Sequence, residues 1–302
     1  MTIDNPCVSI IINCYNGEKY LKEALNSILN QTYENWEIIF WDNQSSDLSA
    51  KIFKSYKDKR FKYFYSENHT SLYKARNLAI EKSSYDFIAF LDTDDLWERN
   101  KLELQMPHFD NKEIGLVFSN FWLLKGNNNK KKLYINKTLP SGKIYNDLIN
   151  NYCVGILTTI IRKKSYQNLD KVFDDRFSII GDFDLFLRLA KENSFASIQE
   201  PLAYYRLHGQ NFSTLNKAKE VTEFKTWIEE NKSYLSNMQI NKMQKDIDYK
   251  RFLNSKIDGK FKESINILFK SKISLFNLKN LFLLLMPVNV LKKFLWFYND
   301  PN

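Results

Sequence analysis

The sequence is poor in cysteine and lacks the apolar segments that secretion or membrane spanning requires. Its 302 residues include three irregularly spaced cysteines, so neither a disulfide framework nor a cysteine-type metal site is predicted. Residues 1–6 carry Asp4 and no apolar core of signal-peptide length, which argues against secretion. The apolar run at 281–286 is far shorter than the roughly 20 residues of a spanning helix. We therefore expect a cytoplasmic protein that is at most peripheral on the inner face of the cytoplasmic membrane.

Basic residues outnumber acidic ones and give a formal net charge of +9. Such a balance suits nucleic acid, an anionic membrane surface or a phosphorylated substrate as partner. A lysine-rich surface that merely stays solvated explains the charge as well. The positions of the charged residues must therefore decide between these interpretations.

The first part of the chain alternates strand and helix patterns with short connections. Runs of β-branched and aromatic residues predict strands, and apolar residues at helical spacing predict the helices between them. The predicted strands are 8–12, 36–41, 61–65 and 87–91. A βαβα order of this kind predicts an α/β fold with a mostly parallel sheet flanked by helices.

The pattern becomes less regular after the fourth strand. We expect further strands at 115–119, 155–161 and 203–207, and a helix that begins near Asp182. The asparagine- and lysine-rich segment 126–132 is expected to be an exposed loop.

From about residue 217 the sequence indicates helices and shows no strand-type alternation. We therefore expect a sheet domain over 1–215 and a basic helical extension over 216–302. The end of the extension, 281–298, carries apolar residues around Lys292 and Lys293, which fits an amphipathic helix at a membrane interface. A helix that packs its apolar stripe on the protein's own core fits the same pattern.

Polar clusters follow three of the four predicted parallel strands. They occupy 13–16, 42–46 and 92–95. Ordinary turn chemistry explains each cluster singly, because Asp, Asn and Ser are common in turns. The carboxyl ends of parallel strands meet at one edge of a sheet, where ligands bind in this class of fold. We therefore expect the three clusters to form one binding site.

The segment Asp92-Thr93-Asp94-Asp95 is the sharpest motif in the chain. Three carboxylates within four residues repel one another, and a bound divalent cation removes that repulsion. Hard oxygen ligands with open positions favour Mn²⁺ or Mg²⁺, which can bridge to a substrate diphosphate. The competing interpretation is a helix N-terminus, with Asp95 capping a helix that begins near Trp97. That interpretation explains one aspartate and leaves two without a reason.

At this point the sequence resembles a known family, the inverting nucleotide-sugar glycosyltransferases of family 2, which have the GT-A fold. The resemblance covers about residues 6–210, roughly two-thirds of the chain. Its segments, in matching order and spacing, are 8–16, 31–33 leading to 37–42, 74–77, 87–95 and 181–185. Taken together, these segments are specific to the family. Taken singly, only the segment 87–95, which contains Asp92 to Asp95, is specific.

The resemblance implies a role for each matching residue on the donor side. Tyr15 would stack on the base of the donor nucleotide, and Asp42 and Asn43 would lie at the base and ribose pocket. Asp92 would hold the ribose or assist the metal, and Arg76 would lie near the donor. Simpler alternatives stay open, namely a core-edge aromatic for Tyr15, a strand-ending turn residue for Asp42 and a surface ion pair for Arg76.

The resemblance also implies the metal ligands and the nucleotide. Asp94 would ligate Mn²⁺ or Mg²⁺ with Asp95 beside it, and His208 would reach the metal or a phosphate, unless it is a solvated loop histidine. Family members often carry a second aspartate where this chain has Asn43, and that carboxylate accepts the N3–H of uracil. An asparagine carbonyl accepts the same bond, although its amide also donates. UDP stays the first choice for the donor nucleotide.

An inverting transfer needs one general base, because the acceptor hydroxyl must lose its proton as the new bond forms. Asp182 stands at the position of the family's base, directly after Gly181 and at the head of an amphipathic helix. The alternative is a helix-capping or first-turn aspartate that the helix dipole stabilises. Asp184 is a second candidate, which Arg188 would instead pair with one turn along the helix.

The leading hypothesis is a glycosyltransferase that moves a sugar from a nucleotide-diphosphate sugar, with UDP preferred, to a glycan or glycolipid acceptor in surface polysaccharide, lipooligosaccharide or lipid-linked glycan synthesis. One alternative is a sugar-phosphate nucleotidyltransferase, but residues 13–19 lack the glycine- and basic-rich phosphate loop of that class. The other is a basic scaffold or nucleic-acid-binding protein, which leaves Asp92, Asp94 and Asp95 without a reason, since they would repel phosphate. We therefore expect no nucleic acid partner.

Overall fold

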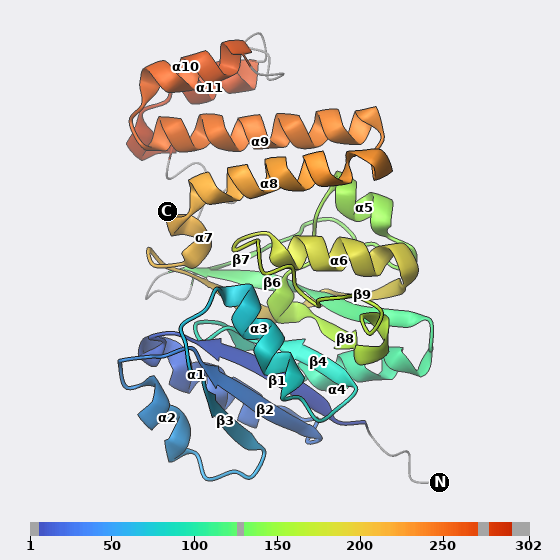
Figure 1. Cartoon of the computed structure of the whole chain (residues 1–302). Helices are drawn as coiled ribbons and strands as arrows, with labels where there is room; N and C mark the ends of the chain where they lie inside the picture. The colour runs from blue at the N-terminus through green and yellow to red at the C-terminus, as the bar shows by residue number, and fades with distance from the viewer. Residues whose placement is uncertain (1–5, 126–129, 271–277, 292–302) are drawn as a thin grey trace. The chain divides into compact units, whose positions relative to one another are not determined.

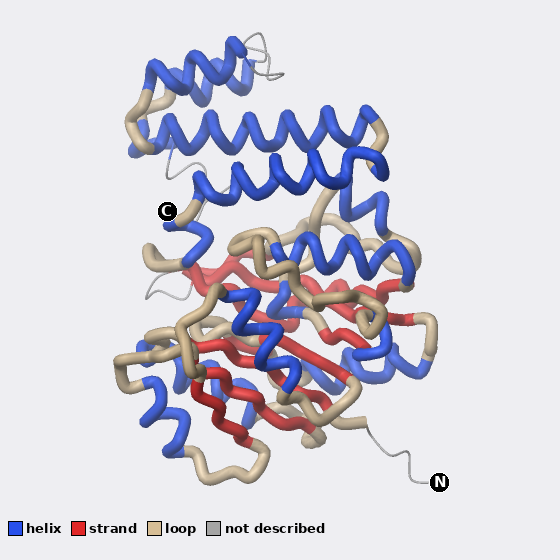
Figure 2. The backbone as a smooth tube through the Cα atoms, viewed as in Figure 1, coloured by secondary structure: helices blue, strands red, loops and turns tan. Residues whose placement is uncertain are grey.

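The computed structural model describes residues 6–125, 130–270 and 278–291 (Figure 1). The chain divides into two compact units, Met1–Arg206 and Leu207–Asn302. The first unit holds the sheet, and the described part of the second unit is helical beyond the end of the last strand (Figure 2). The functional boundary predicted between residues 215 and 216 stays a prediction.

The strands of the described residues form one sheet in the order β3-β2-β1-β4-β8-β6-β9-β5, with β7 added on β6. Their bounds are β1 Val8–Cys14, β2 Trp36–Asp42, β3 Phe61–Tyr65, β4 Phe87–Phe90, β5 Leu96–Trp97, β6 Ile114–Lys125, β7 Lys130–Leu133, β8 Ile160–Arg162 and β9 Ser194–Leu207.

The helices connect these strands and then continue alone. In the first unit they are α1 Glu18–Leu29, α2 Ser49–Ser55, α3 Leu72–Glu81, α4 Lys101–Gln105, α5 Tyr145–Asn150 and α6 Gly181–Glu192, with 3₁₀ turns η1 Met106–Asp110, η2 Ile156–Thr158 and η3 Lys163–Ser165. In the second unit they are α7 Phe212–Leu215, α8 Lys217–Asn231, η4 Lys232–Tyr234, α9 Asn237–Ile257, α10 Phe261–Lys270 and α11 Leu278–Leu285.

The strands β3, β2, β1 and β4 are parallel, as the alternating sequence pattern predicts. Strand β1 lies between β2 and β4, so that Val8 pairs with Trp36 on one side and with Phe87 on the other. Strand β8 joins β4 antiparallel, and β6 in turn joins β8 antiparallel. The fold is therefore the predicted α/β class, with an antiparallel continuation beyond the parallel strands.

The core of the parallel region follows from the alternation of side chains along the strands. Ile10 and Ile12 of β1 point to the face where Leu21 and Leu25 of α1 pack, and none of the four is exposed. Burying an aliphatic side chain of this size contributes about 1.5–3 kcal/mol. Helix α3 packs on β1 and β2, where its buried Ala79 allows a close approach. The two helix layers fix the strand ends at which the polar clusters stand.

Two predictions about the less regular region were wrong. Lys130 to Lys132 belong to β7, which pairs with β6 and is steadied by Lys131 lying 4.6 Å above the Trp122 ring, while 126–129 of the predicted loop lie outside the described residues. The predicted strand 155–161 begins instead as η2, and its strand portion starts at Ile160.

Threonine hydroxyls explain the change from strand to 3₁₀ turn at η2. Thr158 Oγ1 donates 2.7 Å to the carbonyl of Gly155, and Thr159 Oγ1 donates 2.9 Å to that of Ile156. These local bonds satisfy carbonyls that a strand would otherwise offer to a neighbour. The hydroxyls therefore favour the turn over the ladder that the apolar residues predict.

The second unit buries part of the apolar run near the end of the chain. Leu283, Leu284, Met286 and Leu291 join a cluster with Phe252 of α9. This contact agrees with core packing for these residues, whereas Lys292 and Lys293 of the predicted interfacial helix lie outside the described residues. In the described part of the chain, none of the helices has both the length and the hydrophobicity of a bilayer crossing.

Candidate active site

The ends of β1, β2 and β4 meet at one edge of the sheet. Cys14, the last residue of β1, stands in register with Asp42, the last residue of β2. The segment that follows β1 also touches the segment that follows β4, because a Cβ on Gly17 would lie 2.7 Å from Thr93 Oγ1. The fold thus brings the three polar clusters together, as expected from the parallel order.

The loops after β1 and β2 are bound to each other. The Asn43 amide donates to the Cys14 carbonyl over 2.8 Å, and the Ser46 amide donates to Asn16 Oδ1 over 2.8 Å. Asn16 and Gln44 adopt positive φ angles of 54° and 70°. Such left-handed backbone is uncommon outside glycine and collects at binding sites. The two loops therefore form one rigid surface.

Tyr15 stands on this surface with 58% of its area exposed. Its ring centroid lies 4.4 Å from that of His69, and the two planes are inclined by 56°. His69 Nδ1 lies 2.9 Å from the Asn43 carbonyl oxygen, which fixes the imidazole. An exposed aromatic with a held aromatic neighbour suits base stacking better than a place at the edge of the core. His69 follows β3 in a loop without a distinctive motif, so the sequence pattern does not single it out.

Asp42 and Asn43 are buried, and their side-chain polar atoms form hydrogen bonds within the protein. Asp42 Oδ1 accepts the Ser45 amide at 2.7 Å, and Oδ2 accepts the Tyr63 hydroxyl at 2.7 Å. Asn43 Oδ1 accepts both the amide and the hydroxyl of Thr70, while its Nδ2 donates to the Thr70 carbonyl. Both residues shape the loops at the strand ends, and their predicted contact with the base stays a prediction.

Asp92 forms an ion pair with a buried arginine. Arg76 Nη2 lies 2.6 Å from Asp92 Oδ1, with 3% of the arginine side chain and 33% of the aspartate side chain exposed. Burial alone would lower the pKa of Arg76, but Asp92 and other neighbours raise it instead. The arginine is therefore a buried ion-pair residue and not a surface one, and its place near the donor stays a prediction. The exposed part of Asp92 remains available to a ligand.

Asp95 is buried at the base of the same segment. Its Oδ1 accepts the Arg206 amide at 2.9 Å, and Arg206 Nε donates to the Asp94 carbonyl at 2.9 Å. Burial, together with the charges of Asp94 and Asp92, raises the pKa of Asp95 well above its ordinary value. The predicted alternative, a helix cap near Trp97, is wrong because Trp97 lies in β5 and α4 begins at Lys101.

The chemistry of this segment fits a cation that is shared with a substrate. Within the described ranges, no group of three or more His, Cys, Asp or Glu side chains is arranged to hold an ion. Mg²⁺ is commonly bound through one or two carboxylates together with substrate phosphates, and needs no complete protein cage. Asp94 and Asp92 add to the burial that raises the pKa of Asp95, and a cation beside these carboxylates would relieve their mutual repulsion. The metal roles of Asp94 and Asp95 remain predictions.

Asp182 lies in the first turn of α6, two residues after the N-cap residue Ile180. Its Oδ1 accepts the Phe183 amide at 2.8 Å and the Tyr73 hydroxyl at 3.2 Å. Both of these hydrogen bonds reach the same oxygen of the carboxylate. Burial raises the pKa of Asp182, while Arg76, the Phe183 amide and Tyr73 counteract that rise. Oδ1 is thus held by two donors, and the role of Asp182 as the base stays a prediction.

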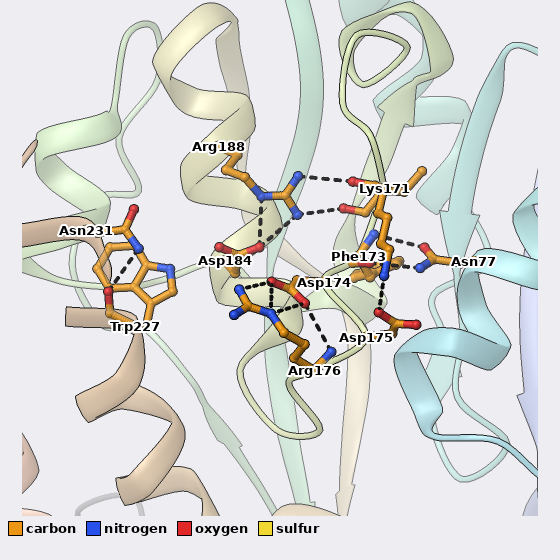
Figure 3. A network of polar contacts seen from close by, with 11 residues as sticks. Asn77, Lys171, Phe173, Asp174, Asp175, Arg176, Asp184, Arg188, Trp227 and Asn231 are labelled. Carbon is orange, nitrogen blue, oxygen red and sulfur yellow. Dashed lines mark hydrogen bonds and ion pairs between the residues drawn. The ribbon is translucent and has the colours of Figure 1, made fainter. Parts of the chain in front are cut away.

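Asp184 is engaged as the helical spacing predicts. Arg188 Nη2 lies 2.8 Å from Asp184 Oδ2, and the same guanidinium donates to the carbonyls of Lys171 and Val172 (Figure 3). The Asp184 carboxylate orients an arginine that holds the chain before α6. This engagement makes Asp184 a weaker candidate for the base than Asp182.

Asn77 of α3 binds the backbone of Phe173, the residue that follows Val172. Its Nδ2 donates 2.8 Å to the Phe173 carbonyl, and its Oδ1 accepts the Phe173 amide at 2.9 Å (Figure 3). The Phe173 ring stacks on Tyr73 with a centroid distance of 5.1 Å. The residues 171–173 are therefore fixed between α3 and α6, directly beside the contact between Tyr73 and Asp182.

His208 falls in the second compact unit. Its backbone amide donates to Asn211 Oδ1 over 2.6 Å, and its Nδ1 accepts the Gln210 amide at 3.3 Å. These contacts form a local turn after β9. The predicted contact of His208 with a metal or phosphate stays a prediction.

Sequence comparison agrees with this arrangement. The family model described as glycosyl transferase family 2 matches residues 9–177. The UDP-Glc:alpha-D-GlcNAc-diphosphoundecaprenol beta-1,3-glucosyltransferase WfgD of Escherichia coli is 34% identical over 222 residues, which cover 72% of this chain and 84% of that protein. The putative teichuronic acid biosynthesis glycosyltransferase TuaG of Bacillus subtilis (strain 168) is 30% identical over 231 residues, covering 76% and 88%.

Solved structures share the fold. Staphylococcal (S. aureus) TarS superposes with a TM-score of 0.60 at 18% identity, over 94% of this chain and 50% of that one, so the chain spans about half the length of TarS. The mannosyltransferase PcManGT from Pyrobaculum calidifontis, solved with GDP-Man and Mn²⁺, gives 0.58 at 14% identity, over 75% of this chain and 65% of that one. The architecture is the GT-A fold, and since the family model matches more than half of its residues, the chain belongs to glycosyltransferase family 2.

Proposed function

We propose that the chain transfers a sugar from a UDP-sugar, with inversion, to a hydroxyl of a surface polysaccharide, a lipooligosaccharide or a lipid-linked glycan. WfgD is named for UDP-Glc and for an acceptor that carries GlcNAc on diphosphoundecaprenol. TarS has been solved with UDP and with UDP-GlcNAc. These names support a UDP-sugar and a cell-surface acceptor for this chain.

The donor would bind along the three strand ends. The exposed Tyr15 ring, backed by His69, offers an aromatic surface to the base. The accessible part of Asp92, which Arg76 holds in place, offers an acceptor to the ribose hydroxyls. Asp94 and Asp95 would hold Mn²⁺ or Mg²⁺, which supplies positive charge to the diphosphate leaving group when it is bound.

The observation that carries the proposal is the geometry of Asp182. The Phe183 amide and Tyr73 fix Oδ1, so Oδ2 can take the proton of the acceptor hydroxyl. As the proton leaves, an electron pair of the acceptor oxygen forms the bond to C1 of the sugar. The bond from C1 to the diphosphate breaks on the opposite face, and the nucleoside diphosphate departs. One base and one displacement give inversion.

Donor binding and turnover test this proposal separately. In the first experiment, the melting temperature of the full chain is measured with UDP-glucose, UDP-GlcNAc or GDP-mannose in the presence of Mn²⁺. In the second, a separate sample is assayed for UDP release with a diphosphate-linked GlcNAc lipid as acceptor. We expect a UDP-sugar to raise the melting temperature selectively, because a ligand that binds the folded state stabilises it. Stabilisation by GDP-mannose alone would overturn the choice of base, and absence of stabilisation by all three would overturn the function.

The reaction product distinguishes transfer from nucleotidyl transfer. A glycosyltransferase releases UDP from a UDP-sugar, whereas a sugar-phosphate nucleotidyltransferase converts UTP and a sugar phosphate to a UDP-sugar and pyrophosphate. We expect UDP and no pyrophosphate. Pyrophosphate release from UTP would favour the second class.

A lipid-linked acceptor would place the enzyme at the inner face of the cytoplasmic membrane, and we include this peripheral location in the proposal. Lys292 and Lys293 supply positive charge beside the apolar run near the end of the chain. Changing both to glutamine should weaken flotation with anionic vesicles and leave donor binding unchanged. A charge-matched double change of Lys57 and Lys59, which lie between α2 and β3, is the control. Equal flotation of the two variants would argue against the tail.

A further inference from the structure

The hydroxyl of Tyr73 lies within hydrogen-bond distance of two acceptors, one on the candidate general base Asp182 and one on the chain just before it. It lies 3.2 Å from Asp182 Oδ1 and 3.0 Å from the carbonyl oxygen of Ile179. Both neighbours accept hydrogen bonds, and a phenol has one hydrogen to donate. The hydrogen therefore serves whichever acceptor carries more negative charge, and that is Asp182 when it is ionised.

We propose that Tyr73 is a positioning residue for the transfer, which orients Asp182 and favours its ionised form before the acceptor arrives. The inference rests on the proposed role of Asp182 as the base. When Asp182 has taken the acceptor proton on Oδ2, its attraction for the hydroxyl hydrogen weakens, and the hydrogen turns to the Ile179 carbonyl. Tyr73 thus stabilises the state in which the base is competent and leaves the protonated state without an unsatisfied donor.

The ring of Tyr73 is fixed, so its hydroxyl has little freedom to leave this position. The side chain is 3% exposed and stacks on Phe173. A Cβ added to Gly181 would lie 2.6 Å from Cδ2 and Cε2 of the ring. Glycine at this position therefore lets the ring pass against the start of α6. Asn77, which fixes the backbone of Phe173 on both sides, holds the stacking partner in place.

Three ionisable groups face Asp182 from the elements around it. Tyr73 and Arg76 come from α3, and Tyr152 follows α5. Arg76 and Tyr73 lower the pKa of Asp182, against the dominant effect of burial, which raises it. The Tyr152 hydroxyl is buried and has no hydrogen-bond partner in the described structure, so it offers no comparable stabilisation. Arg76 acts by charge at a distance, and Tyr73 acts by direct contact.

The test is a pH–rate profile of single-turnover transfer at saturating UDP-sugar, with wild type, Tyr73→Phe and Tyr166→Phe. Phenylalanine keeps the ring and removes the hydrogen bond. Tyr166 is the matched control, because its buried hydroxyl makes no hydrogen bond in the described structure. In Tyr73→Phe we expect the acid limb to move to higher pH, with a loss of roughly tenfold at its acidic end and a much smaller loss on the alkaline plateau. Tyr166→Phe should follow the wild type.

A second variant, in α6, disturbs the same contact between Tyr73 and Asp182. Gly181→Ala must displace the Tyr73 ring, so it should shift the acid limb in the same direction, and it should add no further shift to Tyr73→Phe. An unshifted limb in a folded Tyr73→Phe, or a uniform loss at every pH, would overturn the role of Tyr73. Undiminished transfer by Asp182→Asn would instead overturn the base role, and with it the proposed mechanism. The two failures are therefore distinguishable.

Discussion

The guanidinium of Arg76 donates to Asp92 Oδ1 over 2.6 Å, and its charge also lowers the pKa of Asp182. Asp92 is a candidate for donor binding, whereas Asp182 is the candidate base on the acceptor side. Arg76 is buried on α3, so water screens its charge weakly. A single side chain thus acts on both halves of the proposed reaction.

Changing Arg76 to glutamine should affect both halves together. Glutamine is polar but carries no charge, so the pKa of Asp182 should rise. Because the base acts in its ionised form, a higher pKa means that transfer is lost at low pH first and recovers as the pH rises. Donor affinity should fall as well, since Asp92 loses its ionic partner. Donor titration and a pH–rate profile measure the two effects.

Arg60→Gln is the control for Arg76→Gln, because it removes the same charge from an arginine whose ionic partner is Asp58. It should leave both the donor affinity and the profile near the wild type. If Arg76→Gln weakens donor binding but leaves the acid limb in place, the guanidinium acts on Asp92 alone.

The two hydrogen bonds between the Asn77 side chain and the Phe173 backbone are called the Asn77 clasp. Replacing the side-chain nitrogen of Asn77 with oxygen should lower the stability of the fold. Asn77→Asp keeps the acceptor of the Phe173 amide but removes the donor to the Phe173 carbonyl. These bonds are partly buried, so losing one partner should cost about 1 kcal/mol of the free energy of unfolding, the low end of the range for buried bonds. Urea unfolding measures the change in the free energy of unfolding. Asn151→Asp, at an exposed asparagine, is the control. Equal stability of the two variants would show that the clasp does not hold the segment.

The sequence predicts the parallel half of the fold because that half depends on local patterns. Strand β1 is a β-branched run, and α1 presents Leu21, Leu25 and Ile28 at helical spacing. The convergence of Asp42 and Asp92 at one edge follows from parallel strand order alone. These inferences need no knowledge of distant contacts, which is why the structure agrees with them.

The sequence does not predict the contacts that join distant segments. Tyr73 and Asp182 are separated by 109 positions, and a tyrosine in a helical pattern is ordinarily assigned to packing. The role of Gly181 becomes visible only when the Tyr73 ring is seen against it. His69 belongs to the same class, because its contact with Tyr15 depends on how two loops fold over the sheet edge. Asn77 stood within a recognised motif, but its partner did not.

Asp94→Asn should separate metal-supported donor binding from folding. Asparagine has the shape of aspartate without its charge, so it is a poorer ligand for a hard cation. We expect most of the Mn²⁺-dependent part of the donor affinity to be lost, with the melting temperature of the protein alone little changed. Titration of the UDP-sugar with Mn²⁺ and with EDTA gives both values, and the exposed Asp110→Asn is the control. Equal Mn²⁺-dependent affinity in variant and wild type would remove Asp94 from the metal site.

The decisive change for the mechanism is Asp182→Asn. Asparagine accepts the hydrogen bonds that now reach Oδ1 from the Phe183 amide and Tyr73, so the loop and helix should keep their shape. It takes no proton, and transfer should therefore fall by roughly 10²–10⁴-fold, the usual contribution of general-base catalysis. Donor and metal should still bind almost normally, because the base acts on the acceptor.

A structural role for Asp182 predicts a different outcome for the same change. An aspartate that only supports the start of α6 is replaced by asparagine at a cost of a few tenths of a kcal/mol, by the ranking of residues at helix starts. Such a variant would transfer within a few-fold of the wild type. Single-turnover transfer at saturating donor, with donor affinity measured separately, decides between the two roles. Asp184→Asn serves as the control, because Arg188 already occupies that carboxylate and its loss should lower stability more than rate. If Asp184→Asn abolished transfer while Asp182→Asn retained it, the base would be Asp184, and the hydrogen bond from Tyr73 to Asp182 would serve the fold alone.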